Sequence, residues 1–351
     1  MAISKGTRWF AKGSLMVLAI YLGSTYLIRY ATSPPWIAKE SAAPEKIKQP
    51  PANEARFRSS FEAGKQALSD GRYANALDYF LEAERSTDEL SDDQYNALKE
   101  ARLQIAQLYE SSGDNVAANT VYRALADCAN HDGNALYKDK SFDSALARAR
   151  DAEQFSDRLS EGKRDALQES TSLLVSALWA LHQYGEAVNA QQHWIDFLKA
   201  SADDYDQAFI QAYMTLEGIY GDAKDWHGVE QALVQTIDAC DRIHAHFIAA
   251  NVAFSDPTAP RNWSQYNLVI AYYQEGNTDT ALSKAEDFFS EYSQKEQDTT
   301  HPVSVVYHSS DFAALALQIA REAKRQDDID LWQKRAPGGI KIIALHPPGT
   351  Q

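Results

Sequence analysis

The chain has 351 residues, of which 44% are hydrophobic and 24% charged, a balance typical of a folded protein with a continuous core. Its formal net charge is −15, but residues 1–50 hold seven Lys and Arg against two Glu, so the remaining residues carry −20. A body this acidic repels phosphate backbones. The charge therefore argues against nucleic acid as a partner and favours other proteins.

The amino-terminal segment combines a basic start with an apolar run. Residues 1–12 contain three basic and no acidic side chains, and residues 13–28 contain no charged side chain. As a helix this run would span about 24 Å, and Lys12 and Arg29 could reach the headgroups at its two ends. The pattern predicts a single transmembrane anchor with its amino terminus in the cytoplasm or matrix. A cleaved signal peptide has the same order of segments and is the alternative.

The strongest signal is an internal repeat. In FEAGKQALSDGRYANALDYFLEAE, residues 61–84, small and large apolar residues alternate at helical spacing around a glycine. Small residues let two helices cross closely, the glycine permits a tight turn, and large residues fill the space between hairpins. The stretch resembles a tetratricopeptide repeat. The residues that carry the resemblance are Gly64, Ala67, Gly71, Tyr73, Ala76, Phe80 and Ala83.

The same spacing returns in four later stretches, residues 105–126, 173–197, 216–236 and 267–289. In the third copy His182 and Gln191 replace the usual turn glycine and large apolar residue. The matching positions are Ala106, Tyr109, Gly113, Ala118, Tyr122 and Leu125; Val175, Leu178, Tyr184, Ala187 and Trp194; Leu216, Tyr220, Trp226, Val229 and Leu233; and Val269, Tyr272, Gly276, Ala281, Ala285 and Phe288.

The remaining segments are assigned around these copies. Residues 29–52 contain five prolines and predict an extended tether to a repeat domain over 53–335, and residues 336–351 predict an irregular tail. Residues 142–155 have helical period and predict a degenerate second helix after an irregular connection at 130–140. Residues near the end of the domain predict a helical cap, with apolar positions at Val306, Phe312, Leu315, Ile319, Ile329 and Leu331.

The predicted fold class is therefore all-α, a superhelix of TPR-like hairpins preceded by one transmembrane helix. Stacked hairpins leave an extended inner surface made by their first helices, which suits a receptor for peptides or helices. A purely architectural spacer is the alternative. The family's geometry implies that the protein-binding groove includes Lys65, Gln107, Trp179, Met214, Trp263, Tyr266 and Tyr273.

Aromatic residues make up much of that predicted groove. Aromatic and Met surfaces accommodate varied apolar segments through large contact areas. Aromatic side chains at helical spacing also fill cores, so both roles stay open for Trp179, Trp263, Tyr266 and Tyr273. Lys65 alone does not make a clamp for a carboxyl terminus.

The sequence shows no motif that would indicate catalysis. It contains no phosphate-binding loop, no GxSxG and no HExxH. Cys240, His244 and His246 lie close in sequence, but the two histidines diverge by about 200° on a helix and no fourth ligand follows. We therefore predict no enzyme activity, metal, cofactor or small-molecule substrate, and two unbridged cysteines, Cys128 and Cys240. A hydrolase with a site in the connections at 130–140 and 250–262 is the alternative of another class.

A narrower resemblance concerns residues 89–128, ELSDDQYNALKEARLQIAQLYESSGDNVAANTVYRALADC. This segment and the helix before it, about 75 residues, look like the repeats of the fungal mitochondrial inner-membrane adaptor of the i-AAA protease. The resemblance implies a matrix-facing amino terminus, a body in the intermembrane space, and recruitment of unfolded substrates to an AAA protease. Kinesin light chains share parts of the pattern. A bacterial envelope scaffold with a periplasmic body is the alternative.

Overall fold

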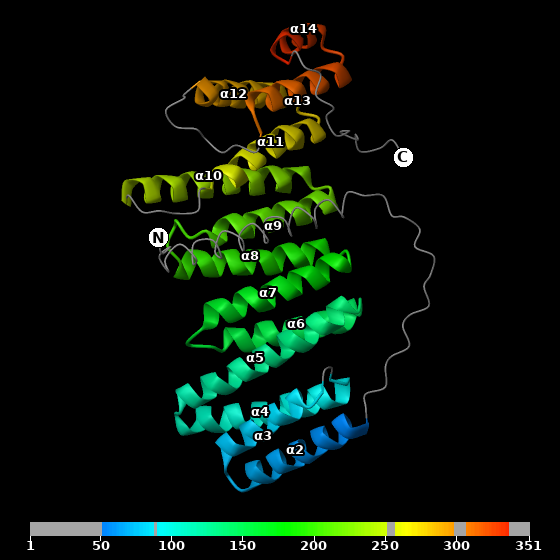
Figure 1. Cartoon of the computed structure of the whole chain (residues 1–351), viewed down its shortest axis with the longest axis vertical. Helices are drawn as coiled ribbons and strands as arrows, with labels where there is room; N and C mark the ends of the chain where they lie inside the picture. The colour runs from blue at the N-terminus through cyan, green and yellow to red at the C-terminus, as the bar shows by residue number, and fades with distance from the viewer. Residues whose placement is uncertain (1–50, 88–89, 251–256, 298–306, 337–351) are drawn as a thin grey trace, which may run out of the picture. The chain divides into compact units, whose positions relative to one another are not determined.

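The computed structural model describes residues 51–87, 90–250, 257–297 and 307–336. Over these ranges the chain forms thirteen helices and no strand, so the all-helical prediction is confirmed there (Figure 1). The helices are α2 (Pro51–Ser69), α3 (Tyr73–Arg85), α4 (Asp92–Ser112), α5 (Asn115–Lys138), α6 (Phe142–Asp157), α7 (Lys163–Ala180), α8 (Tyr184–Ser201), α9 (Ala208–Ala223), α10 (Trp226–Ala250), α11 (Thr258–Gln274), α12 (Thr278–Gln297), α13 (Ser309–Glu322) and α14 (Gln326–Arg335).

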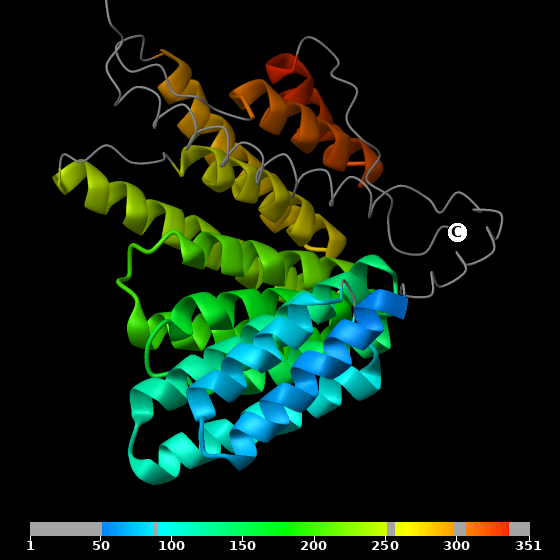
Figure 2. The same ribbon diagram turned by 60° about the horizontal axis from the view of Figure 1, so that its bottom comes forward.

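The helices stack in chain order as hairpins. Six pairs follow one another, α2/α3, α4/α5, α7/α8, α9/α10, α11/α12 and α13/α14, with α6 between the second and third pairs (Figure 1). Figure 2 shows the same stack from its α2 end, with successive hairpins lying alongside one another. Each hairpin thus buries its apolar face mainly against its neighbours, as in other repeat proteins.

Tight turns within the hairpins share one backbone feature. Each contains a residue in the left-handed region, with φ between 57° and 84°. Three of these residues are glycines, which reach this region without strain. Four are not, so the turn persists at a cost of roughly 1 kcal/mol each. The turn residues are Gly71, Gly113, Lys140, His182, Lys224, Gly276 and Lys324.

Helix α5 corrects the prediction of an irregular connection at 130–140. It runs unbroken from Asn115 to Lys138, and α6 follows after a turn at Lys140. Gly133 lets the neighbouring helices pack closely on this part of α5, because a Cβ there would lie 2.6 Å from Leu173 Cδ2 and 3.0 Å from Arg148 Cβ. Helix α5 is therefore the second helix of one hairpin and the first helix of the next.

A buried ion pair fixes α5 against α6. Arg148 Nε donates to Asp132 Oδ2 at 2.6 Å, and both side chains are at most 6% exposed. The guanidinium of Arg148 also lies 3.7 Å from the ring centroid of Tyr95 and donates to Asp92 Oδ1 at 2.6 Å. These contacts join α4, α5 and α6, so they set where the end of α5 lies.

The last two helices close the described stack. Trp332 of α14 is 1% exposed, whereas Leu331 is 41% exposed, so the apolar position predicted at Leu331 is wrong by one residue. The polar side chains of α14 lie on its outer side. This arrangement, an apolar inner and a polar outer face, is what a terminal repeat needs.

The expected anchor at 13–28, the tether up to Pro50 and the tail after Ala336 lie outside the described residues, except that α2 already begins at Pro51. None of the helices described is long and apolar enough to cross a membrane. Cys128 and Cys240 are both buried and are not joined by a disulfide.

Candidate protein-binding surface

Counting back from the left-handed turn residue defines one face of each first helix. Residues 13, 10, 6 and 3 places before the turn are separated by three or four residues, so they share one side of a helix. We call this set the first-helix stripe. In α7 it consists of Glu169, Ser172, Ser176 and Trp179. All seven residues predicted for the groove lie on this stripe in their own helices.

A solvent-open hollow of about 510 Å³ lies on the stripe between α5 and α7. Its walls come from the end of α5 and from one side of α7. The lining residues are Asn134, Tyr137, Asp165, Gln168, Glu169, Ser172, Leu173 and Ser176. Because Asn134 and Tyr137 lie 6 and 3 places before Lys140, α5 contributes stripe positions here as a first helix.

The hollow is rich in acceptor oxygens. Asp165 and Glu169 lie one turn apart, both exposed, and neither forms an ion pair with any residue that the structure describes. Asn134 donates through Nδ2 to the Asn130 carbonyl at 2.8 Å, which leaves its Oδ1 available. The hydroxyls of Ser172 and Ser176 add further acceptors. Carboxylates and neutral acceptors around one space suit an ammonium or guanidinium group.

The acidic residues also have a structural role. Helix α7 starts at Lys163 after Gly162, which supplies no capping side chain. Negative charge near a helix amino terminus is stabilising by about 0.3–1 kcal/mol. Asp165 in the first turn therefore favours the helix itself. Glu169 lies nearly two turns in, where this effect has faded, so its exposed carboxylate has no such explanation.

Tyr137 forms the apolar part of the wall. Its ring is half-buried and packs at 5.3 Å, centroid to centroid, on the ring of Phe142. Leu173, 3% exposed, lies at the base. An aromatic face beside carboxylates can hold the alkyl stem of a long cationic side chain and attract its charge.

Trp179 lies on the same stripe as the hollow, three residues after Ser176. It is half-buried, and its Nε1 donates to Asp222 Oδ2 at 2.6 Å. Its six-membered ring lies against Gly218, where a Cβ would come within 2.6 Å. Trp179 therefore packs between the first helices α7 and α9.

Aromatic side chains of the α11 stripe pack against the next hairpin. The ring of Tyr266 stacks on Tyr307 at 4.1 Å and meets Phe312 edge-on at 5.7 Å. Tyr273 donates its hydroxyl to Glu322 Oε2 at 2.9 Å. We call Tyr266, Tyr273, Tyr307 and Phe312 the aromatic junction.

A hydrogen bond from α11 holds the aromatic junction in place, and burial removes part of the junction from water. The buried Asn262 side chain donates to the Tyr307 carbonyl at 3.1 Å, which holds Tyr307 under Tyr266. Burial raises the pKa of Tyr273 to about 12, and the hydrogen bond to Glu322 adds to the shift. Trp263, also half-buried, packs on another cluster that includes Val229, Leu233 and Leu268.

The other predicted residues lie apart from the hollow. Lys65 is exposed and paired with Glu62 at 3.1 Å. Gln107 is exposed on α4. Met214 is half-buried against the cluster around Leu216 on α9. Trp263, Tyr266 and Tyr273 thus lie on one helix, α11, but Trp263 packs on a different cluster from the two tyrosines. Lys65 and Gln107 lie on separate hairpins.

Asn134, Tyr137, Asp165 and Glu169 were not anticipated from the sequence. A signal for the first two does exist, because Gly133, Ala145, Ala149 and Ala152 repeat the spacing of Gly64, Ala76, Phe80 and Ala83. That spacing identifies α5 as a first helix. No comparable signal marks the two carboxylates, since acidic residues at a helix start are common.

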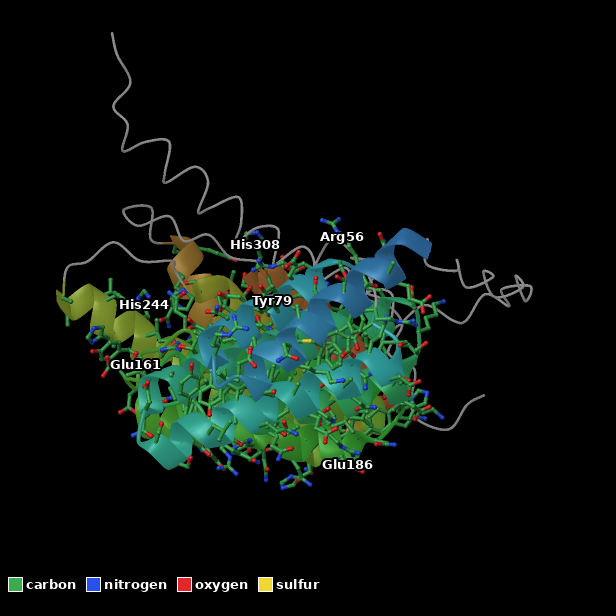
Figure 3. The ribbon with its side chains drawn as sticks, turned by 90° about the horizontal axis from the view of Figure 1, so that it is seen from below. Arg56, Tyr79, Glu161, Glu186, His244 and His308 are labelled. Carbon is green, nitrogen blue, oxygen red and sulfur yellow. The ribbon has the colours of Figure 1, made fainter. Side chains whose placement is uncertain are left out.

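The cysteine and histidines considered for zinc do not converge. Among the residues described, Cys240, His244 and His246 form no group within metal-ligand distance. His246 stacks on Tyr205 with ring centroids 3.4 Å apart, and His244 lies at the outer edge of the body (Figure 3). Burial raises the pKa of the Cys128 thiol to about 12, so it is a poor nucleophile.

Comparison with known proteins gives similarity of low degree. No family model and no curated protein matches the chain. One solved structure that it resembles is a putative kinesin light chain from Podosopora anserina, whose TPR-like repeats are nearly identical to one another. The two chains share 15% identity, the match covers 62% of this chain and 93% of that one, and the TM-score is 0.40. BtubC from P. vanneervenii shows 14% identity, coverage of 86% and 98%, and a TM-score of 0.37.

The apo form of RapI shows 11% identity, coverage of 80% of this chain and 86% of that one, and a TM-score of 0.38. At these TM-scores the likeness supports no statement about partners.

Proposed function

We propose that this chain is a non-catalytic scaffold that binds segments of other proteins along its first-helix stripe, and that the hollow between α5 and α7 receives a Lys or Arg side chain. The observation that carries this proposal is the pair of exposed carboxylates, Asp165 and Glu169, which have no cationic partner among the described residues. They face a space lined by further acceptors and one aromatic ring.

The charge of the body supports a positively charged partner. The chain after residue 50 carries a formal −20, so a basic segment is attracted over a distance comparable to the Debye length. Contact at one hollow contributes only part of the affinity. A charge-assisted hydrogen bond contributes about 1.5–3 kcal/mol, so losing both carboxylates should weaken binding by tenfold or more.

The test measures fluorescence anisotropy of a short labelled peptide that carries two arginines, together with its glutamine counterpart. We expect the arginine peptide to bind more tightly, and Asp165→Asn with Glu169→Gln to remove about tenfold of that affinity. Rising salt should weaken binding of the arginine peptide, because the attraction is screened.

A matched control is the double variant Asp78→Asn with Glu82→Gln. These two carboxylates are also exposed and one turn apart, but they lie on the second helix α3. If this control weakens binding as much as the hollow variant, only the net charge matters and the proposed hollow is wrong. Equal binding of the arginine and glutamine peptides would also overturn the proposal.

We further propose that residues 13–28 anchor the chain in the mitochondrial inner membrane, with the body in the intermembrane space, as an adaptor that brings unfolded substrates to an AAA protease. The uncharged run between Lys12 and Arg29, the acid-free start and the resemblance of residues 89–128 support this proposal. A preference for basic segments fits this role. Folded proteins also expose Lys and Arg side chains, but an unfolded substrate presents them in extended segments that can lie along the first-helix stripe.

Alkaline carbonate treatment of mitochondria tests the anchor, and protease treatment of mitoplasts tests its orientation. We expect the chain to stay in the membrane pellet and its body to be digested only after the outer membrane is opened. Release by carbonate, or protection of the body in mitoplasts, would contradict the proposal. Deleting residues 13–28 while keeping residues 1–12 is the matched variant, and it should release the body.

A further inference from the structure

A second polar cluster lies where two neighbouring hairpins meet, far along the chain from the hollow. His227 is the second residue of α10, and Glu230 lies one turn later on the same helix. Glu275 caps the carboxyl end of α11, next to the turn at Gly276. One ligand atom of each side chain lies within 4.8 Å of the other two.

The distances in this cluster suit a shared cation better than direct pairing. His227 Nδ1 lies 3.6 Å from Glu230 Oε2 and 3.7 Å from Glu275 Oε1. Both separations exceed those of good hydrogen bonds. Around a tetrahedral zinc ion with bonds of about 2.0–2.2 Å, ligand atoms are separated by roughly 3.3–3.5 Å. His227 Nδ1 is therefore within a few tenths of an ångström of the separation from each carboxylate oxygen that a shared zinc ion requires.

Neighbouring groups already hold the ligands in place. Tyr272 donates its hydroxyl to Glu230 Oε1 at 2.8 Å, which leaves Oε2 for the ion. The side-chain amide nitrogen of Gln231 lies 2.8 Å from His227 Nε2 and donates to it. When zinc takes the lone pair of His227 Nδ1, the ring proton moves to Nε2, and a half-turn of the Gln231 amide lets its oxygen accept that proton. Outer partners of this kind are typical of metal sites.

The carboxylates are also sheltered and lack a cationic partner. The side chains of Glu230 and Glu275 are 24% and 16% exposed, and no Lys or Arg pairs with either among the residues described. Two half-buried carboxylates this close repel each other unless a cation lies between them. His227, 71% exposed, leaves an open path for entry.

We propose that His227 Nδ1, Glu230 Oε2 and Glu275 Oε1 bind a zinc ion, with water at the fourth position, and that the ion joins the α9/α10 hairpin to the α11/α12 hairpin. Imidazole with two carboxylates is a ligand set that zinc accepts. The site is independent of the hollow, and zinc would stiffen the stack between the two hairpins.

The test uses the purified full-length chain and zinc chloride alone. Isothermal titration should show one zinc ion per chain, and zinc should raise the melting temperature. His227→Ala and Glu275→Gln should each weaken zinc binding at least tenfold while circular dichroism keeps the helical signal.

The matched control is His193→Ala, because among the described residues His193 pairs with a single carboxylate, that of Glu153, at 3.1 Å. This variant should keep the affinity for zinc. Unsaturable zinc binding, or an unchanged affinity in His227→Ala, would overturn the proposal. So would a cobalt-substituted protein with a thiolate charge-transfer band, since that would place the ion at Cys128 or Cys240 instead.

Discussion

The hollow between α5 and α7 and the aromatic junction between α11 and α13 occupy the same stripe but are built differently. At the hollow, α7 carries Glu169, Ser172 and Ser176 on the stripe, and the space beside them is open to solvent. At the junction, the α11 position equivalent to Ser172 carries Tyr266, and Tyr273 lies two turns later on the same stripe. Both tyrosine side chains contact the segment and helix that follow. One face of the repeat is thus available for a partner in one place and used for packing in the other.

This difference shows what side-chain size does on a repeat surface. A first helix is followed by the first helix of the next hairpin, and large rings on the stripe reach across to it. Ser172 and Ser176 are too short to do so, and the space beside them remains open. A stripe of small polar residues therefore leaves more of a first helix open to solvent than a stripe of aromatic ones.

The largest expected effect concerns the buried ion pair between Arg148 and Asp132, which positions the end of α5 beside the hollow. Asp132→Ala leaves the guanidinium of Arg148 buried without its 2.6 Å partner, so the free energy of unfolding should fall by about 3–5 kcal/mol. Urea denaturation measures it. Asp92→Ala removes the other carboxylate on Arg148, which is 74% exposed, and should cost less than about 1 kcal/mol. Equal losses would show that burial of Asp132 does not matter.

The next effect separates packing from contact at the aromatic junction. Tyr266→Ala removes a half-buried ring stacked on Tyr307, so unfolding free energy should fall by about 2–3 kcal/mol, somewhat below the loss for a fully buried ring. Thermal and urea melts measure this loss of stability, and the peptide titration is repeated on the same variant. A folded variant with unchanged stability and tenfold weaker peptide binding would instead favour the contact role predicted for Trp263, Tyr266 and Tyr273.

A smaller effect, of opposite sign, comes from Glu217 on α9. It lies seven residues before the turn at Lys224, the place that Gly64 and Gly133 occupy in other first helices. Part of the Glu217 side chain is exposed, but its Oε2 atom is buried without a hydrogen bond. Burial raises the pKa of the Glu217 carboxyl to about 8. The folded state therefore holds the proton more strongly than the unfolded chain, whose pKa is near 4.5.

Stability from this group is complete below about pH 4.5 and is lost as the pH rises toward 8. Glu217→Gln cannot ionise, so the variant should be more stable than the parent by about 1–2 kcal/mol above pH 8 and nearly equal to it near pH 4.5. Urea melts across this range measure the difference. A difference that does not change with pH would contradict the assignment.

The smallest effect tests the rim of the aromatic junction. Tyr273→Phe removes the hydroxyl that donates to Glu322, an exposed contact, and should cost about 0.5 kcal/mol. Because the folded pKa of Tyr273 is raised to about 12, the parent should lose this increment as the pH rises from about 10 to 12, and the variant should not. A loss near that of Tyr266→Ala would place Tyr273 inside the core.

The sequence by itself determined the repeating helical hairpin and which residues share the first-helix stripe. Gly64, Ala76 and Phe80 show why: close helix crossing and inter-hairpin packing depend on residue size at fixed spacing, which can be seen directly in the chain. It also determined the acidic character of the body. The departure at His182 did not hide the third hairpin, because a histidine can take the left-handed turn at modest cost.

Only the tertiary structure decided which stripe residues are available and how far α5 extends. Exposure of Tyr266 depends on Tyr307 and Phe312, which come from segments more than 40 residues later in the chain. Likewise, α5 continues through Gly133 because Leu173 and Arg148 pack against it, and their contacts are not local. Local spacing fixes the face of a helix, whereas the distance to the next hairpin fixes whether that face is open.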